Sequence, residues 1–178
     1  MELSFRRITI ADAAQLLLVR SSTRENPYSI EALAEAGITE PSIVESLCMN
    51  IHDGCLCEAD SHLIGFSMVD LKGGELLVVA VLPEFEGLGV GRKLLGLAEE
   101  LLWAAGHSSI FLWTPTDRNT RAYHLYRSES WNEAEETAGK LFMRKCRSNQ
   151  RLEPTLPSVT SHARHSSRQT IARLTHKR

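Results

Sequence analysis

The sequence predicts a mixed α/β fold in a single domain, and three observations lead to this class. Three short apolar segments follow one another with three or four residues between them, which is typical of an antiparallel meander. A proline and a glycine-rich loop then lead into a long stretch with helical periodicity. Finally, a chain of 178 residues is long enough for one domain with a good core but short for two.

The N-terminal residues predict a strand followed by a helix. Leu3 and Phe5 alternate with polar residues and fall on one face of an extended segment. Thr9 has the residue type of a helix N-cap, and Asp12 stands three residues later, as in a capping box. We therefore expect a first helix over AAQLLLVR, residues 13–20.

Two further helices are expected before the meander. SIEALAEAG, residues 29–37, has Ser29 as its N-cap and Gly37 at its end. Ser42, after Pro41, is expected to cap a third helix over IVESLCMN.

The meander and the C-terminal elements complete the predicted domain. Pro83 lacks a backbone N–H and therefore ends the last meander strand. A helix starting near Gly91 is expected to end at Gly106, and another to start at Asn119. The expected strands after residue 50 are 55–59, 63–70, 75–82, 109–113 and 140–145. The helix expected to start at Asn119 covers 120–129.

The composition changes after Cys146. Residues 147–178 contain seven Lys or Arg and one acid, a formal charge of +6, and have few large apolar side chains. Such a segment buries too little to offset its ordering entropy. We expect a domain over 1–146 and a basic, disordered extension over 147–178. Binding of nucleic acid by this extension is not favoured, because its charges are scattered and lack interleaved aromatic residues.

Neither a membrane span nor a metal site is predicted. No segment reaches 18 consecutive apolar residues, and the N-terminus lacks the apolar core of a signal peptide, which together predict a cytoplasmic protein. The cysteines, Cys48, Cys55, Cys57 and Cys146, do not have the spacing of a zinc site. We expect reduced cysteines in and around a strand.

The loop EGLGVGRKLL, residues 86–95, predicts an anion site. A Walker loop requires Ser or Thr after the Lys, but Leu94 follows Lys93. A dinucleotide fingerprint requires a third glycine at position 92 or 94, where Arg92 and Leu94 stand. What remains is a glycine-rich backbone at a helix N-terminus, where unpaired N–H groups attract an anion. An ordinary structural turn is the alternative.

Two segments resemble the GNAT superfamily of N-acetyltransferases. VAVLPEFEGLGVGRKLL, residues 79–95, resembles that family's acetyl-CoA loop, a Q/R-x-x-G-x-G/A pattern after a strand that ends at a proline. NTRAYHLYRSESW, residues 119–131, resembles the family's N-x-R-A-x-x-x-Y-x-x-x-G-W/F segment at the same spacing from the loop. The similarity covers about residues 3–145, and it implies a GNAT-type fold in which a splayed parallel strand follows the loop helix.

The resemblance implies a binding site for acetyl-CoA as cosubstrate, without a metal. The pyrophosphate of coenzyme A would be bound by the backbone N–H groups of Gly87, Leu88, Gly89, Val90, Gly91 and Arg92. The pantetheine arm would pair with the main chain of Val79, Ala80 and Val81, as in strand augmentation, and Asn119 would also contact the cofactor.

Two residues depart from the family pattern. Glu86 occupies the Q/R position and places a carboxylate near the expected diphosphate, which predicts weaker binding. Ser130 replaces a glycine at a turn that often requires a positive φ, at a local cost of about 1 kcal/mol.

The resemblance also indicates the catalytic residues. Tyr126 matches the family's catalytic tyrosine, which would protonate the leaving thiolate; the alternative is a tyrosine that only packs its helix. For the base, Glu75 at the start of the cofactor strand is the leading candidate, with a solvated hairpin residue as the alternative. The other base position of the family corresponds to Thr114, and His124 is expected to be exposed.

The acceptor is indicated only by charge. Between Glu25 and Leu71 there are nine acids and no Lys or Arg, and in this family the segment after the first strand forms the acceptor side. An acidic surface favours a cationic acceptor, either a small amine or a peptide or protein amine. We therefore predict an N-acetyltransferase with direct transfer, and the alternative is a non-catalytic acyl-CoA-binding module. Whether the chain acts as a monomer or a homodimer is left open.

Overall fold

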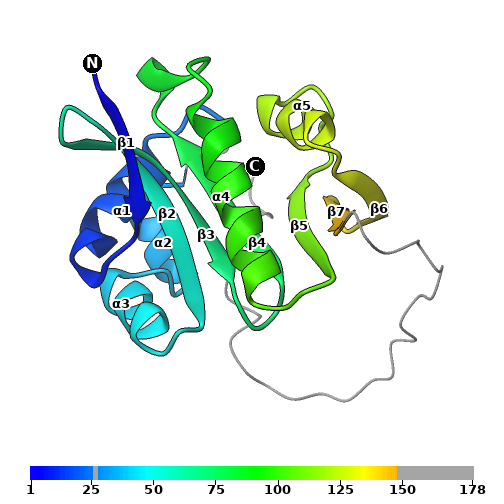
Figure 1. Cartoon of the computed structure of the whole chain (residues 1–178), viewed down its shortest axis with the longest axis horizontal. Coiled ribbons are helices and arrows are strands. Elements are labelled where there is room, and N and C mark those ends of the chain that lie inside the picture. Colours follow the sequence, from blue (N-terminus) through cyan, green and yellow to red (C-terminus); the bar gives the residue numbers. More distant parts are fainter. Residues whose placement is uncertain (26–27, 148–178) are drawn as a thin grey trace.

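The computed structural model describes residues 1–25 and 28–147, which form one seven-stranded mixed sheet with helices on both faces (Figure 1). The strand order is β1-β2-β3-β4-β5-β7-β6. The strands are β1 (Leu3–Arg7), β2 (His52–Ala59), β3 (His62–Asp70), β4 (Glu75–Val81), β5 (Ser109–Pro115), β6 (Asn132–Thr137) and β7 (Lys140–Cys146). The helices are α1 (Ala13–Ser21), α2 (Ile30–Glu35), α3 (Glu40–Cys48), α4 (Val90–Ala104) and α5 (Arg121–Ser128), with short 3₁₀ turns at Ile10–Asp12 and Pro83–Phe85.

The predicted meander is confirmed. Strands β1 to β4 pair antiparallel in chain order, and β2 begins three residues earlier than expected. The β2–β3 turn is tight because Asp60 and Ser61 both adopt a positive φ, of 48° and 67°. Pro83 stands two residues after the end of β4 and opens a 3₁₀ turn, a position that tolerates its missing N–H.

Most helix ends agree with the prediction, but the expected start residues Ser42 and Asn119 do not cap their helices. Thr9 and Asp12 form the predicted capping box, and Ser29 caps α2. The predicted cap Ser42 is wrong: α3 begins at Glu40, and Thr39 caps it by accepting a hydrogen bond from the Ser42 N–H. The reason is that a proline is tolerated within a first helical turn, so the helix starts before it.

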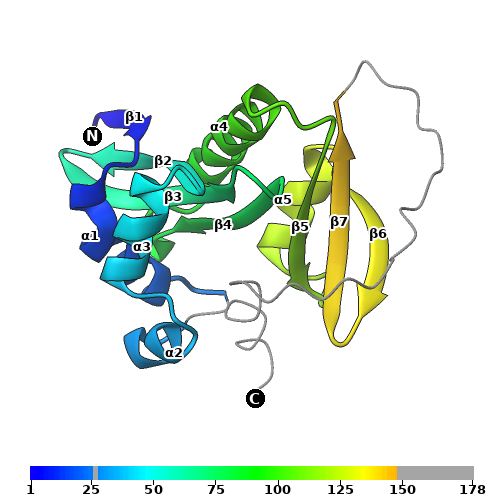
Figure 2. The same cartoon turned by 90° about the horizontal axis from the view of Figure 1, so that it is seen from below.

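The sheet divides the helices into two layers (Figure 2). Helices α1 and α3 pack on one face of β2–β4, with α2 against α1, and α4 crosses the other face. The core under α4 and α5 also includes β5, β7 and the fully buried Trp131. Strands β5, β7 and β6 form the second half of the sheet, after β1–β4. Helix α5 packs where the two halves meet, since its Tyr126 shares a cluster with residues of β4 and β5.

The parallel strands β4 and β5 are splayed. They pair at Glu75 and Phe111, and the Phe111 N–H donates to the Gly74 carbonyl at 3.1 Å; in the described part of the chain this is the extent of their ladder. On its other side β4 stays paired with β3, but Leu77 is an extra residue between two paired neighbours. Such a bulge bends a strand, and it lies where β4 parts from β5.

Strand β6 was not predicted from the sequence. Its six residues are all exposed and include three glutamates, so they show neither apolar alternation nor β-branched enrichment beyond one threonine. The strand forms by pairing with β7 through a turn in which Ala138 and Gly139 have a positive φ. Tertiary pairing therefore overrides local propensity at this edge.

The expected C-terminal extension lies outside the described residues, apart from Arg147. Its N–H donates to the carbonyl of Ser108 at 3.1 Å, which continues the contact between β7 and β5 by one residue. Within the described ranges, no helix combines the length and the apolar character that crossing a membrane requires.

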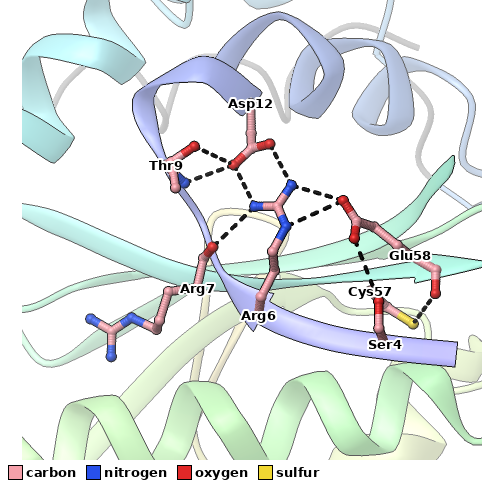
Figure 3. A network of polar contacts seen from close by, with 7 residues as sticks. All are labelled: Ser4, Arg6, Arg7, Thr9, Asp12, Cys57 and Glu58. Atoms are coloured by element: carbon pink, nitrogen blue, oxygen red, sulfur yellow. Dashed lines mark hydrogen bonds and ion pairs between the residues drawn. The ribbon is translucent and has the colours of Figure 1, made fainter. Parts of the chain in front are cut away.

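A network of polar contacts joins β1, β2 and the start of α1 (Figure 3). Two nitrogens of Arg6 donate to the two oxygens of Asp12, both at 2.8 Å, and Arg6 also pairs with Glu58 at 2.8 Å. Asp12 accepts further bonds from the N–H and hydroxyl of Thr9. The hydrogen bonds from Arg6 are the main cause that holds the pKa of Asp12 well below its usual range.

We expect Asp12→Asn to lower the free energy of unfolding at pH 7 by about 2–3 kcal/mol, because it leaves the Arg6 cation short of one carboxylate. A depressed folded-state pKa stabilises the protein above the unfolded pKa of about 3.9 and loses this effect as the pH falls below it. In urea titrations, the difference from wild type should therefore shrink between about pH 4 and pH 3. Equal losses at pH 7 and pH 3 would contradict this account, and Glu100→Gln, at an exposed acid on α4, is the control.

Candidate active site

The glycine loop follows the C-terminal end of β4, where β4 and β5 are no longer paired. Gly87 and Gly89 have φ values of 82° and 80°, a conformation that other residues rarely adopt. A Cβ atom added at either position would meet no other heavy atom within 4 Å, so the backbone at both positions faces open space. The side chain of Leu88 between them is half exposed. The loop can therefore let a ligand approach its main chain closely.

The loop leads directly into the N-terminus of α4. Gly89 is the N-cap, and the first hydrogen bond of the helix runs from the Lys93 N–H to the Gly89 carbonyl at 3.0 Å. The amides of Val90, Gly91 and Arg92 precede this bond and stand at the positive end of a 15-residue helix. This is the arrangement that binds a phosphate group, so the residues fit the predicted diphosphate.

The strand before the loop offers a backbone edge. Val79, Ala80 and Val81 pair with β3 on one side, and on the other side they face the splay. An extended ligand with amide groups fits such an edge, as the predicted pantetheine arm does. An arm that starts at the loop and follows this edge points toward Glu75, about 20 Å away along β4.

Tyr126 lies on α5 and is buried, with 8% of its surface exposed. It packs in one apolar cluster with Leu76 of β4 and Leu112 of β5, and its ring centroid lies 6.2 Å from that of Trp131. Burial raises the pKa of Tyr126 to about 12, and the nearby Arg20 cation opposes this effect. The hydroxyl therefore keeps its proton throughout the neutral range.

Hydrogen bonds at the C-terminus of α5 hold the backbone of Tyr126 in place. The carbonyl of Tyr126 accepts a hydrogen bond from the Trp131 N–H at 3.0 Å, and the carbonyl of Arg127 accepts one from the Ser130 N–H at 3.2 Å. These two bonds form a Schellman motif, with Ser130 in the left-handed region at a φ of 66°. The positive φ expected at Ser130 is confirmed.

Glu75 is the first residue of β4, where β4 and β5 are still paired. It is adjacent in sequence to Leu76, which belongs to the cluster around Tyr126. This adjacency does not bring Glu75 and Tyr126 together, because neighbouring side chains of a strand point to opposite faces of the sheet. Helix α5 is instead anchored beside the glycine loop, where Glu129 pairs with Arg92 and Arg121 pairs with Glu86. Thr114 is buried in β5 and His124 is exposed on α5.

Arg92 and Asn119 lie at opposite ends of α5. The Arg92 guanidinium donates to the Glu129 carboxylate at 2.7 Å, so its charge is shared with the C-terminal end of α5. Asn119 is exposed in the turn before α5, and its N–H donates to the Asp117 side chain. It does not start the helix as predicted, because Thr120 is the N-cap and accepts from the Tyr123 N–H at 3.2 Å.

The structure corrects the electrostatic argument about Glu86. Its carboxylate lies 3.2 Å from Arg24, which follows α1, and 3.1 Å from Arg121 at the start of α5. The Glu86 side chain is 16% exposed, and the same oxygen is close to both guanidinium groups. The three side chains together carry one positive charge, so Glu86 is no uncompensated negative charge beside the loop.

Three residues near this site were missed from the sequence. Arg24 and Glu25 reach the glycine loop and α5, and Arg20 lies close enough to Tyr126 to act on its pKa. They stand about 100 residues before α5 in a segment without a motif. Only a three-dimensional structure brings such distant residues together.

The remaining chemistry-bearing residues form no metal centre. Among residues 1–25 and 28–147, no group of three or more His, Cys, Asp and Glu side chains could hold a metal ion. Cys55 and Cys57 are buried in β2, where desolvation raises the pKa of both thiols. Such thiols stay protonated and unreactive at neutral pH.

The fold and the site together define a class of protein: a mixed-sheet α/β protein with a main-chain anion cradle at the open end of two splayed parallel strands. The family model described as "Acetyltransferase (GNAT) family" matches residues 21–129, which is more than half of the chain. The chain therefore belongs to the GNAT acetyltransferase family. No curated protein sequence matches it significantly.

Solved structures support the fold. The PaiA N-acetyltransferase of Thermoplasma acidophilum, solved with coenzyme A, is 23% identical, with a TM-score of 0.71 over 83% of this chain and 100% of that one. The ribosomal-protein-S18-alanine N-acetyltransferase of Escherichia coli is 18% identical, with a TM-score of 0.61 over 85% and 100%. The putative acetyltransferase yncA of Salmonella typhimurium, solved with acetyl-CoA, is 14% identical, with a TM-score of 0.63 over 87% and 99%.

Proposed function

We propose that this chain is an acetyl-CoA-dependent N-acetyltransferase that transfers the acetyl group directly to a primary amine. The observation that carries this proposal is the splay between β4 and β5, with the glycine cradle at its open end and Tyr126 buried in the apolar cluster that includes residues of both strands. Family membership and the neighbours solved with coenzyme A or acetyl-CoA support the use of an acyl-CoA.

The cosubstrate would be held mainly by main-chain groups. The amides from Gly87 to Arg92 would bind the pyrophosphate, and the free edge of Val79–Val81 would pair with pantetheine amides. Because the cradle consists of backbone, its geometry depends on the two glycines with a positive φ rather than on any one side chain.

We expect Gly89→Ala to weaken acetyl-CoA binding at least tenfold, which corresponds to about 1.4 kcal/mol. Alanine resists the φ of 80° and places a methyl group in the open space beside the loop. The measurement is calorimetric titration with acetyl-CoA. The matched control is Gly96→Ala within α4, where an added Cβ also meets nothing within 4 Å but the backbone is helical. Equal affinities of both variants would contradict the placement of the diphosphate.

Acetyl-CoA supplies an activated acetyl thioester, and the protein must assist proton transfer at both the nitrogen and the sulfur. The ammonium form of the amine first loses one proton; the neutral nitrogen then bonds to the carbonyl carbon while the carbon–sulfur bond breaks, and it loses a second proton while the sulfur gains one, so that one proton is released overall. The Tyr126 hydroxyl, which is protonated at neutral pH, would donate to the sulfur. Burial also raises the pKa of the leaving thiol, so a thiolate formed in the same apolar surroundings accepts this proton more readily than it would in water.

For the proton on the amine we propose Glu75 as the general base, acting directly or through a water molecule. A Lys-like amine with a pKa of about 10.4 is neutral to only a few parts in 10⁴ at pH 7, so removal of its proton is worth several kcal/mol. The position of Glu75 at the paired end of the splay supports this role, since the pantetheine edge leads there.

The acceptor side is expected to favour cations. Several acids of the run from Glu25 to Asp70 have partners within the protein, including Asp53 with Arg7 and Glu58 with Arg6. Four exposed carboxylates of the run lie on α2 and α3, namely Glu31, Glu35, Glu40 and Glu45. Four negative charges on these two helices favour a small cationic amine or a basic peptide or protein amine.

A panel of amines tests this proposal. Acetylation by the wild-type protein is measured by mass spectrometry with polyamines, aminoglycosides, amino acids and peptides that differ in their N-terminal residues. We expect the lowest KM for cationic acceptors, with a KM that rises with ionic strength because the attraction is screened. A preference for neutral or anionic amines would contradict the proposed acceptor class.

A further inference from the structure

The segment that follows α1 contacts the start of α5. The Glu25 carboxylate accepts hydrogen bonds from the Arg121 N–H, at 3.0 Å and 3.1 Å to its two oxygens, and from the Ala122 N–H at 3.5 Å. The Thr120 side chain accepts from the third amide of the turn, that of Tyr123. Glu25 and Thr120 together therefore satisfy the amides that no helical bond can satisfy.

A second tie joins the same elements through side chains. Arg24 pairs with Glu86 of the glycine loop, and Glu86 pairs with Arg121 of α5. Arg24 and Glu25 are consecutive, so one short segment is bound to the loop through the first residue and to the helix through the second. These contacts connect the acceptor side, the cofactor loop and α5.

Helix α5 depends on such contacts for its position. It has eight residues, which is too short for a helix that is stable by itself. Its C-terminus is held by the Schellman motif and by the pair of Arg92 with Glu129. Its N-terminus is held by Glu25 and by Glu86 through Arg121. Tyr126 stands between these two anchors.

We propose that Glu25 is a positioning residue for acetyl transfer: by capping α5 from the segment after α1, it holds Tyr126 in place against the splay. This inference rests on the proposed function. Proton transfer requires the donor and acceptor atoms to come within about 2.6–3.2 Å, and a displacement of about 1 Å at a catalytic group can cost a factor of up to 10². Glu25 thereby makes the acid on α5 dependent on the acceptor side of the protein.

The test compares Glu25→Ala and Glu25→Gln with wild type and with Glu100→Ala, which removes an exposed acid from α4. We expect Glu25→Ala to lower kcat about tenfold, with the KM for acetyl-CoA within about threefold of wild type. Glu25→Gln keeps an oxygen that can accept from the N–H of Arg121 or Ala122 but loses the charge at the helix N-terminus. Its kcat should therefore lie between the values of wild type and Glu25→Ala. Glu100→Ala should behave as wild type.

A double-mutant cycle with Tyr126→Phe separates positioning from general destabilisation. If Glu25 acts through Tyr126, then Glu25→Ala should lower kcat by less than about twofold when the hydroxyl is already absent. A tenfold loss in both backgrounds would overturn the proposal, because Glu25 would then act independently of Tyr126.

Amide hydrogen exchange gives a readout that needs no activity. Glu25→Ala should increase exchange of the α5 amides about tenfold or more, whereas Glu100→Ala should not. Unchanged exchange in α5 would overturn the role of Glu25 even if kcat falls. A wild-type protein that acetylates no amine would contradict the proposed function alone, and exchange would still decide whether Glu25 holds α5.

Discussion

Tyr126→Phe is expected to lower kcat for acetyl transfer by about 10²-fold or more. The substitution removes the hydroxyl that would protonate the leaving sulfur, and it keeps the ring that packs with Leu76, Leu112 and Trp131. Because the ring stays in place, the free energy of unfolding and the affinity for acetyl-CoA should change little. Steady-state release of coenzyme A, together with a calorimetric titration, measures both quantities on the same protein.

Tyr123→Phe is the matched control. The Tyr123 hydroxyl donates to the Glu133 carboxylate at 2.6 Å, at the edge of the sheet, so its loss should leave kcat within about threefold. The raised pKa of Tyr126 adds a test of pH dependence: loss of its proton should not reduce kcat of the wild type below about pH 10. If Tyr126→Phe keeps the full kcat, the hydroxyl takes no part in the reaction.

Glu75→Gln is expected to lower kcat at pH 7 by about 10²-fold for an alkylamine acceptor. Glutamine has nearly the same shape but cannot accept a proton from the ammonium group. The deficit should shrink as the pH approaches the amine pKa of about 10.4, since the amine then arrives already neutral. Rates measured between pH 7 and pH 10 with wild type and variant give the deficit at each pH.

The comparison with Glu100→Gln controls for the loss of one negative charge. Glu100 is exposed on α4, so this variant should follow the wild-type pH profile. A deficit in Glu75→Gln that is the same at pH 7 and pH 10 would exclude Glu75 as the group that deprotonates the acceptor. It would then have a structural role at the start of β4.

Much of the fold could be predicted because local signals agreed with the tertiary structure. Pro83 ended its strand, the glycines of the loop marked the start of a helix, and Ser29 and Thr9 capped theirs. Each of these residues acts through its own backbone or through neighbours within four positions. Such signals are contained in short stretches of sequence.

The remaining features depend on contacts between distant residues. Strand β6 exists because β7 pairs with it, and its exposed glutamates carry no periodic pattern. The charge of Glu86 was known from the sequence, but its two arginine partners come from 62 residues before it and 35 residues after it. The contact of Glu25 with α5 spans 96 residues. No pattern within one element predicts such contacts.

The most direct test of this account measures acetyl-CoA consumption and acceptor mass in one reaction, with wild-type protein and the amine panel. We predict release of one coenzyme A thiol for each acetyl group found on an amine, at a rate that falls about 10²-fold in Tyr126→Phe. Thiol release no faster than without protein, for every amine, would contradict the account. If calorimetry showed acetyl-CoA binding at the same time, the chain would be an acyl-CoA-binding module rather than an enzyme.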